Sequence, residues 1–319
     1  MHEFEIINKY FSDLSKNNKN SLNLNDDVFF DRSKGLVISV DTYNEGIHFL
    51  NFMRPELVIK KIIRSSISDL ICKGVCPKYY FISGSGNRKH FSKFNLKKIS
   101  KSLKEEQKEY SIKLCGGDTT YSKNLSFTIV SLGFSKKIIY RNKAKLNDDI
   151  YVTGNLGDSF TGLQILKKKI MIKKSSKRYF TLKYFLPDLN IKLAKKLFFF
   201  ANSSIDISDG LFSDLEKLIN KQKLSYQLYL DQIPISKNLK KVIFLKKLKK
   251  VSFISNGDDY QILFTALPSK NGIIKRIAKS LGIKISKIGK ICSHSKKSQI
   301  IDQKGKKITI KNKGYYHRF

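Results

Sequence analysis

The run Leu36-Val37-Ile38-Ser39-Val40-Asp41 ends an apolar, β-branched segment with a carboxylate. Val and Ile favour strands, so the run predicts a strand at 36–40, with Asp41 where that strand opens into a loop. Similar acid-ended segments recur along the chain, at Asn25-Asp26-Asp27, Ser68-Asp69, Gly116-Gly117-Asp118, Asp206-Ile207-Ser208-Asp209 and Gly257-Asp258-Asp259. The repetition indicates one site whose acids come from the ends of several elements.

Helical and strand patterns alternate around these acids. A long helical pattern begins at Pro55 and runs to Leu70, and Gly74 with Pro77 predicts its end. Further helices are expected at 3–14, 95–110, 159–168 and 212–220, and strands at 112–115, 126–134, 149–153 and 261–266. Asp209 or Ser208 is a candidate cap of the helix at 212–220, and the Lys-rich stretch 167–183 reads as a solvated loop or helix end. The alternation predicts an α/β or α+β fold.

Length and composition set the class of protein. The 319 residues exceed what one hydrophobic core usually supports, so we expect two domains, at 1–148 and 149–319, joined at the polar stretch 138–148. With 41% hydrophobic residues the chain is expected to be globular. The first residues carry acids and lack the apolar core of a signal peptide, and no 18-residue apolar stretch is present to span a bilayer. Four cysteines without a CxxC pair fit a reducing compartment, so a cytoplasmic location is expected.

The net charge of +36 is the most unusual bulk property. Clustered Lys and Arg bind phosphate backbones without sequence preference, which makes a nucleic-acid partner one reading. The lysines are scattered, however, and accompany abundant Ile, Asn, Phe and Tyr, all of which have A/T-rich codons. A solvated basic surface that follows genome composition is therefore the favoured interpretation, and no specific nucleic-acid partner and no membrane partner are expected.

The acids are crowded although the chain is basic overall. Neighbouring carboxylates raise one another's pKa and oppose folding when no cation lies between them. Divalent cations remove that cost, and oxygen ligands without paired His or Cys favour Mg²⁺ over zinc. Protein-bound Mg²⁺ usually also holds substrate phosphates, so the pattern indicates nucleotide-dependent phosphoryl transfer. The sequence contains no Walker A motif and no protein-kinase catalytic loop.

Eight motifs follow one another along the chain: Asn25-Asp26-Asp27; 39–49; Ser68-Asp69-Leu70 with Gly74 and Pro77; Gly116-Gly117-Asp118-Thr119; Tyr151-Val152-Thr153-Gly154 with Gly157 and Gly162-Leu163; 205–211; Gly257-Asp258-Asp259-Tyr260; and Gly314-Tyr315-Tyr316-His317. In this order they resemble the thiamine-monophosphate kinase family, and the resemblance covers essentially the whole chain. Each motif alone is weak, whereas the ordered set is specific.

The resemblance implies the two-domain fold of the aminoimidazole ribonucleotide synthetase superfamily: an α/β N-terminal domain that binds ATP and Mg²⁺ and helps form a homodimer, and an α+β C-terminal domain. It implies a kinase that converts ATP and thiamine monophosphate into ADP and thiamine diphosphate, with several Mg²⁺ ions. The implied magnesium ligands are Asp27, Ser39, Val40, Asp41, Asp69, Asp118, Asp206 and Asp209. The implied ATP contacts are Gly117, Asp118, Arg141 and Ser208, and the implied thiamine monophosphate contacts are His48, Asp258 and Tyr315.

No general base is expected among these residues. A phosphate monoester is already largely dianionic at pH 7, because its second pKa is about 6. The chain departs from the family pattern at Asn25, where Gly is usual, and at Asp258 and Gln261, where Glu is usual. Two alternatives stay open from the sequence: another ATP-dependent enzyme of the superfamily, and a non-catalytic binder of thiamine phosphates or nucleic acid.

Overall fold

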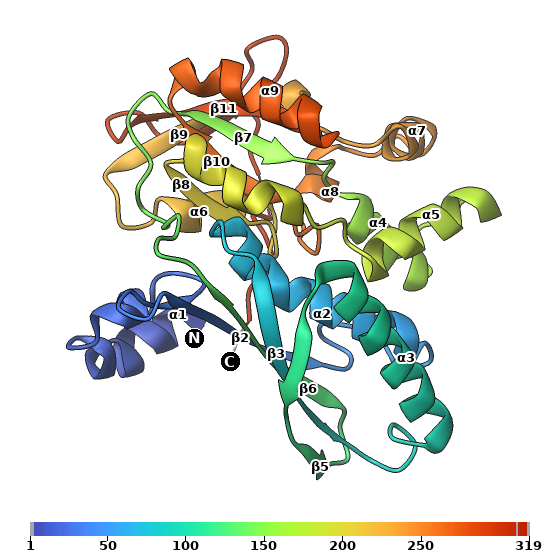
Figure 1. Ribbon diagram of the computed structural model, residues 1–319. Helices are drawn as coiled ribbons and strands as arrows, with labels where there is room; N and C mark the ends of the chain where they lie inside the picture. The colour runs from blue at the N-terminus through green and yellow to red at the C-terminus, as the bar shows by residue number, and fades with distance from the viewer. Residues whose placement is uncertain (1–2, 311, 318–319) are drawn as a thin grey trace.

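Two six-stranded sheets form the framework of the protein, seen here in a computed structural model that describes residues 3–310 and 312–317 (Figure 1). The first sheet has the order β1-β2-β6-β3-β4, with β5 also paired to β3. Its strands are β1 Phe29–Asp31, β2 Leu36–Asn44, β3 Pro77–Gly86, β4 Lys113–Gly116, β5 Thr119–Tyr121 and β6 Ser126–Phe134. The second sheet has the order β12-β9-β11-β7-β10-β8. Its strands are β7 Asp149–Thr153, β8 Ser203–Asp206, β9 Leu224–Tyr229, β10 Ile262–Ala266, β11 Ile285–Ser293 and β12 Gln299–Ile301.

Helices pack against both sheets. The α-helices are α1 Glu3–Ile6, α2 Pro55–Cys72, α3 Lys93–Tyr110, α4 Asp158–Leu166, α5 Lys174–Phe185, α6 Leu211–Leu218, α7 Lys237–Leu245, α8 Val251–Ile254 and α9 Asn271–Leu281. A π-helical turn η1 covers Ile7–Phe11, and 3₁₀ segments cover η2 Ser12–Ser15, η3 Lys19–Leu24, η4 Ile191–Phe199, η5 Leu230–Gln232 and η6 Pro268–Lys270. Among the described residues, no helix is both long enough and apolar enough to cross a membrane. These mixed helices and sheets confirm the predicted α/β class.

Helix α2 lies between the two sheets (Figure 1). Pro55 starts it, since a missing N–H costs nothing in the first turn. Most of its side chains are buried, and it packs against β2 and β6 of the first sheet and β8 of the second. Its buried residues include Lys61 and three serines as well as the Ile residues, so α2 is an interior helix rather than a surface helix with one apolar stripe. Its last turn therefore carries Asp69 into the interior, next to the end of β8.

The outer face of the first sheet is exposed. Val40, Tyr121 and Phe134 keep 61%, 78% and 55% of their surface in water. The apolar core lies on the opposite side, under α2 and α3, where its largest cluster draws on residues from both halves of the chain. The boundary at 148/149 stays a prediction.

Four local expectations differ from the structure. Strand β2 continues to Asn44, so Asp41 lies within it and pairs with Ile129 of β6, rather than at its end. Residues 174–185 form helix α5, because Phe180, Tyr184 and Phe185 pack into the cores despite the flanking lysines. The segment 3–14 changes from α to π to 3₁₀ geometry. Helix α6 starts after Gly210 without a side-chain cap, so neither Ser208 nor Asp209 caps it.

Candidate functional site

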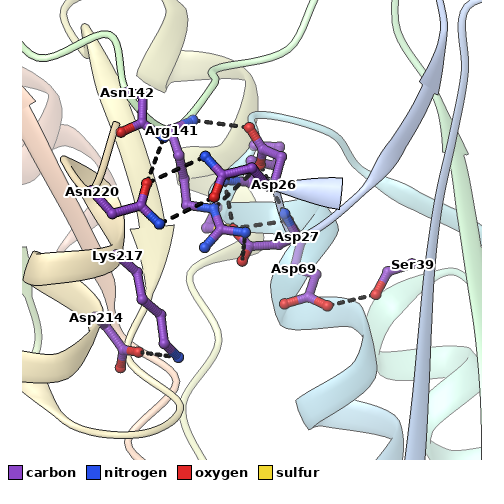
Figure 2. Close-up of polar contacts among 12 residues, drawn as sticks. Asp26, Asp27, Ser39, Asp69, Arg141, Asn142, Asp214, Lys217 and Asn220 are labelled. Atoms are coloured by element: carbon purple, nitrogen blue, oxygen red, sulfur yellow. Dashed lines mark hydrogen bonds and ion pairs between the residues drawn. The ribbon is translucent and has the colours of Figure 1, made fainter. Parts of the chain in front are cut away.

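The acidic pair Asp26–Asp27 precedes β1 and is held by two cations. Lys73 Nζ lies 2.7 Å from Asp26 Oδ1 and 2.6 Å from Asp27 Oδ2. Arg141 donates its backbone N–H to Asp26 Oδ2 at 3.0 Å, and its Nη2 lies 3.4 Å from Asp27 Oδ1. Figure 2 shows the Arg141 side chain against both acids. The structure thus brings Arg141, predicted to contact ATP, to the predicted metal ligand Asp27.

Three further predicted ligands come from different elements. Asp41 lies on β2 and accepts a hydrogen bond from the Tyr43 hydroxyl at 3.0 Å. Asp69, at the end of α2, accepts a short hydrogen bond from the Ser39 hydroxyl, so these two predicted residues meet (Figure 2). Asp206 ends β8 and accepts a hydrogen bond from the Ser68 hydroxyl at 2.7 Å. Among the described residues, none of these three carboxylates forms an ion pair with a lysine or arginine.

The electrostatics divide the four acids into two groups. Burial alone would raise the pKa of Asp27, but Arg141 and Lys73 outweigh it and hold that pKa at about 2. Burial and the charge of Asp27 raise the pKa of Asp41 to about 6, although the Tyr43 hydroxyl opposes the shift. Burial and the same neighbour raise the pKa of Asp206 to about 8. Burial and the charges of Asp41, Asp206 and Asp27 raise the pKa of Asp69 well above its ordinary value.

The donor chemistry fits a hard cation. The acids supply only carboxylate oxygens, with hydroxyls from Ser39 and Ser68, which are ligands that suit Mg²⁺. Burial, and after it repulsion between neighbouring carboxylates, raises the pKa of Asp41, Asp69 and Asp206, and a divalent cation would relieve that repulsion. Within residues 3–310 and 312–317, however, no three His, Cys, Asp or Glu side chains converge closely enough to form a ready-made metal cage.

Asp209 belongs to a neighbouring cluster at the start of α6. Its carboxylate forms an ion pair with Lys217, which lies 3.1 Å from the buried Asp214. Asp214 accepts hydrogen bonds from the backbone N–H groups of Asp209 and Gly210, both at 3.0 Å. This bonding replaces the expected cap. The carbonyl of Ser208 accepts a hydrogen bond from the N–H of Asp258 at 2.8 Å. This bond joins the turn that contains Asp209 to the turn that contains Asp258.

Two of the predicted substrate residues, Asp258 and Tyr315, contact the turn at Ser208 and Asp209. His48 and Tyr315 are connected through His317, whose ring centroid lies 5.4 Å from that of His48 and 5.0 Å from that of Tyr315. Tyr315 also donates its backbone N–H to the carbonyl of Asp209 at 3.0 Å. Burial and His317 lower the pKa of His48, and its Nδ1 accepts a hydrogen bond from the Asn44 N–H.

Asp258 is oriented by a buried lysine. Lys61 is 1% exposed, and its Nζ lies 2.7 Å from Asp258 Oδ1 and 3.3 Å from the carbonyl of Tyr184. The Tyr260 hydroxyl donates to the same Asp258 oxygen at 3.1 Å. Asp258 occupies a left-handed backbone conformation, with φ of 67°. The aspartate therefore has a defined place although its side chain is one methylene shorter than glutamate.

Gly117, Asp118 and Val40 are exposed residues of the first sheet and of the link between its strands β4 and β5. Gly117 and Asp118 are exposed between β4 and β5, and the Asp118 carboxylate accepts the N–H of Thr119 at 2.7 Å. Gly117 is required by close packing, because a Cβ there would lie 1.7 Å from the carbonyl oxygen of Ile82. Asp118 is not among the charged groups that shift the pKa values of Asp27, Asp41, Asp69 and Asp206.

Several residues of the site escape sequence reasoning. Lys61 and Lys73 carry no recognisable signal in a chain with 62 lysines and arginines. Asp214 and Lys217 would have been found from their spacing of three on α6, which places them on one helix face. Asn25, the departure from glycine, forms a reciprocal amide pair with Asn220 at 3.1 and 3.2 Å. Asn142 donates to the same Asn220 at 3.0 Å (Figure 2).

The fold places the chain in the class of AIR-synthase-related proteins. Residues 25–135 match the family described as "AIR synthase related protein, N-terminal domain". The solved structure "AaThiL complexed with AMPPCP and TMP" superimposes with a TM-score of 0.85 at 25% identity, covering 99% of this chain and 97% of that chain.

Full-length relatives then identify the family. The thiamine-monophosphate kinase of Buchnera aphidicola subsp. Acyrthosiphon pisum is 35% identical, over 99% of this chain and 98% of the relative. The thiamine-monophosphate kinase of Haemophilus influenzae is 33% identical, over 91% of this chain and 89% of the relative. The chain belongs to the thiamine-monophosphate kinase family.

Proposed function

We propose that this chain phosphorylates thiamine monophosphate with ATP, giving thiamine diphosphate and ADP, by direct Mg²⁺-assisted transfer. It is a kinase whose acceptor is itself a phosphate group. The observation that carries the proposal is 35% identity to a thiamine-monophosphate kinase over nearly the full length of both chains. A second support is the fold it shares with AaThiL, whose solved complex contains both AMPPCP, an ATP analogue, and TMP.

Asp27, Asp41, Asp69 and Asp206 would hold Mg²⁺ at the core of the site, with Asp118, Asp209, the Ser39 hydroxyl and the Val40 carbonyl as further ligands. When bound, Mg²⁺ neutralises the phosphates and aligns the attacking and leaving oxygens. Among the described residues, Asp41, Asp69 and Asp206 form no ion pair with a lysine or arginine, and this, with their raised pKa values, supports the assignment. Bound cations would bring these carboxylates into their ionised form.

Arg141 is proposed to bind the triphosphate, together with Gly117, Asp118 and Ser208. Its side chain is 6% exposed, and its Nε has no hydrogen-bond partner among the described residues. A planar fork of N–H donors matches phosphate oxygens. Because Arg141 already contacts Asp27, it would bring the triphosphate to the ligand-bearing loop.

The acceptor is proposed to lie beside His48, Asp258 and Tyr315. Burial keeps the His48 imidazole neutral near pH 7, because the pKa of His48 is lowered, so it does not compete with metal for the acceptor phosphate. Lys61 and Tyr260 both contact Asp258 Oδ1, which leaves Oδ2 for a donor group of the substrate. The acceptor phosphate is dianionic without help, and the chain's residues need only position it.

Homodimer formation through the first sheet and a cytoplasmic location complete the proposal. The exposed apolar side chains on the outer face of that sheet, including Val40, Tyr121 and Phe134, support self-association, since such faces mark interaction sites. All four cysteines are free, which is in keeping with a reducing compartment.

Purified protein incubated with ATP, Mg²⁺ and thiamine monophosphate tests the reaction, with thiamine diphosphate resolved by chromatography. We expect product with Mg²⁺ and none with excess EDTA. A folded protein that binds ATP and yields no thiamine diphosphate would contradict the proposal and favour a non-catalytic binder. Retained binding of unrelated DNA across a salt series would instead favour the nucleic-acid alternative.

A further inference from the structure

Lys73 is completely buried at the end of α2, with 0% of its surface exposed. Its ammonium has three donors, and three oxygens surround it. They are Asp26 Oδ1 at 2.7 Å, Asp27 Oδ2 at 2.6 Å and the carbonyl oxygen of Ser204 at 2.8 Å. A buried ammonium is costly unless it is paired and hydrogen-bonded. Here Lys73 forms ion pairs with Asp26 and Asp27 and a hydrogen bond to the Ser204 carbonyl.

Lys73 connects the end of α2 to two other parts of the site. Asp26 and Asp27 precede β1 of the first sheet, whereas Ser204 lies on β8 of the second, two residues before Asp206. Asp27 therefore keeps a defined place relative to β8 before any ligand arrives. The ammonium also contributes a fixed positive charge between two carboxylates that would otherwise repel each other.

We infer that Lys73 is a positioning residue that serves as a permanent internal counter-ion of the Asp26–Asp27 pair, taking a place between these carboxylates that a metal cation would otherwise be drawn to. The metal part of this inference rests on the proposed function. Because Lys73 is covalently attached, its charge is present in every ligand state, and it lowers the affinity of the Asp27 end of the site for Mg²⁺. Asp41, Asp69 and Asp206, which form no ion pair with a lysine or arginine within residues 3–310 and 312–317, form the end of the site that binds Mg²⁺ more tightly.

Lys73→Met tests the inference, since methionine keeps an unbranched chain and removes the charge. Lys97→Met, at an exposed lysine on α3, is the matched control. The readouts are the melting temperature in EDTA and in Mg²⁺, and the Mg²⁺ dissociation constant from titration calorimetry. We expect Lys73→Met to melt lower in EDTA, to gain at least twice the wild-type increase with Mg²⁺, and to bind Mg²⁺ about tenfold more tightly. The control should match wild type.

If Lys73 only stabilised the fold, the measurements would give a different result. Lys73→Met would then lose stability equally in EDTA and Mg²⁺, with an unchanged Mg²⁺ dissociation constant, and that result would overturn the inference. Should the variant be unfolded in EDTA, recovery of its far-UV circular dichroism by Mg²⁺ but not by NaCl of equal ionic strength supports the inference. Equal recovery by both salts, or recovery by neither, overturns it.

The double variant Asp26→Asn/Lys73→Met removes one charge of each sign. On this inference it melts higher in EDTA than Lys73→Met, and its Mg²⁺ response returns toward that of wild type. A double variant with the same Mg²⁺ response as Lys73→Met contradicts the inference. These metal readouts do not require turnover, so a chain that makes no thiamine diphosphate would defeat the proposed function while leaving the role of Lys73 to be decided by these measurements.

Discussion

Replacing Asp206 by asparagine should stabilise the metal-free protein while it abolishes catalysis. Asp206 is 2% exposed, accepts one hydrogen bond from Ser68, and has its pKa raised to about 8 by burial and by Asp27. Asparagine has nearly the same shape and keeps an oxygen for the Ser68 hydroxyl. The change therefore removes a charge without opening a cavity.

The magnitude follows from linkage between protonation and folding. Relative to an ordinary pKa of 3.8, a rise to about 8 corresponds to an upper limit of about 5 to 6 kcal/mol, at about 1.4 kcal/mol per unit. Neutralising Asp206 lets Asp41 and Asp69 ionise more readily, and the repulsion between their charges then offsets part of the gain in stability. We therefore expect a net gain of about 2 to 3 kcal/mol above pH 8.

The sign of the pH dependence is defined by the raised pKa. Below pH 3.8 the carboxyl is protonated in both states and costs nothing. Between pH 3.8 and 8 the folded state binds the proton more tightly, so the wild-type protein loses stability as pH rises. The advantage of Asp206→Asn should therefore be below about 1 kcal/mol at pH 4.5 and reach its full value by pH 8.5.

Urea unfolding in EDTA, followed by far-UV circular dichroism because the chain has no tryptophan, measures both values. Asp13→Asn serves as the control, since that side chain is 77% exposed and should change stability by less than about 0.5 kcal/mol. The reasoning is refuted if Asp206→Asn is less stable than wild type at pH 8.5. An equal gain at both pH values would also refute it, because the gain would then not come from the carboxylate charge.

Three other predictions concern catalysis, the core and assembly. Asp69→Asn should eliminate thiamine diphosphate formation while the circular dichroism spectrum stays native; near-wild-type turnover would remove Asp69 from the metal site. Phe264→Ala should lower the free energy of unfolding by about 3 to 5 kcal/mol in urea, because Phe264 is fully buried and stacked on Tyr151 with ring centroids 5.3 Å apart; a loss below 1 kcal/mol would contradict that packing. Tyr121→Glu combined with Phe134→Glu should reduce the mass seen by light scattering from a dimer to the 36.8 kDa of one chain, and an unchanged dimer would place the interface elsewhere.

Much of the site can be predicted from the sequence, because the end of an apolar run indicates where a helix or strand ends. The helix that starts at Pro55 places Asp69 in its last turn, and the strand before Asp206 places that carboxylate in the interior, as the structure shows. The predicted position of Asp41 at the end of its strand is wrong, because β2 continues and Asp41 pairs with Ile129 of β6. The length of a strand depends on its pairing with a distant strand, which the local sequence does not reveal.

The lysine pattern explains most of what local sequence reasoning missed. Helix α5 looked like a solvated loop because its lysines hid the spacing of Phe180 and Tyr184, one helical turn apart on the same face. Lys61 and Lys73 resemble the many surface lysines, yet both are buried beside carboxylates from elsewhere in the chain. Only tertiary contacts separate these two from the rest.

Transfer of label from ATP tests the central claim most directly. With ATP labelled at the γ-phosphate, Mg²⁺ and thiamine monophosphate, the account predicts that the label appears in the terminal phosphate of thiamine diphosphate, in amounts equal to the ADP formed. Label recovered only as inorganic phosphate, with no labelled thiamine diphosphate, would contradict direct transfer between the two phosphates.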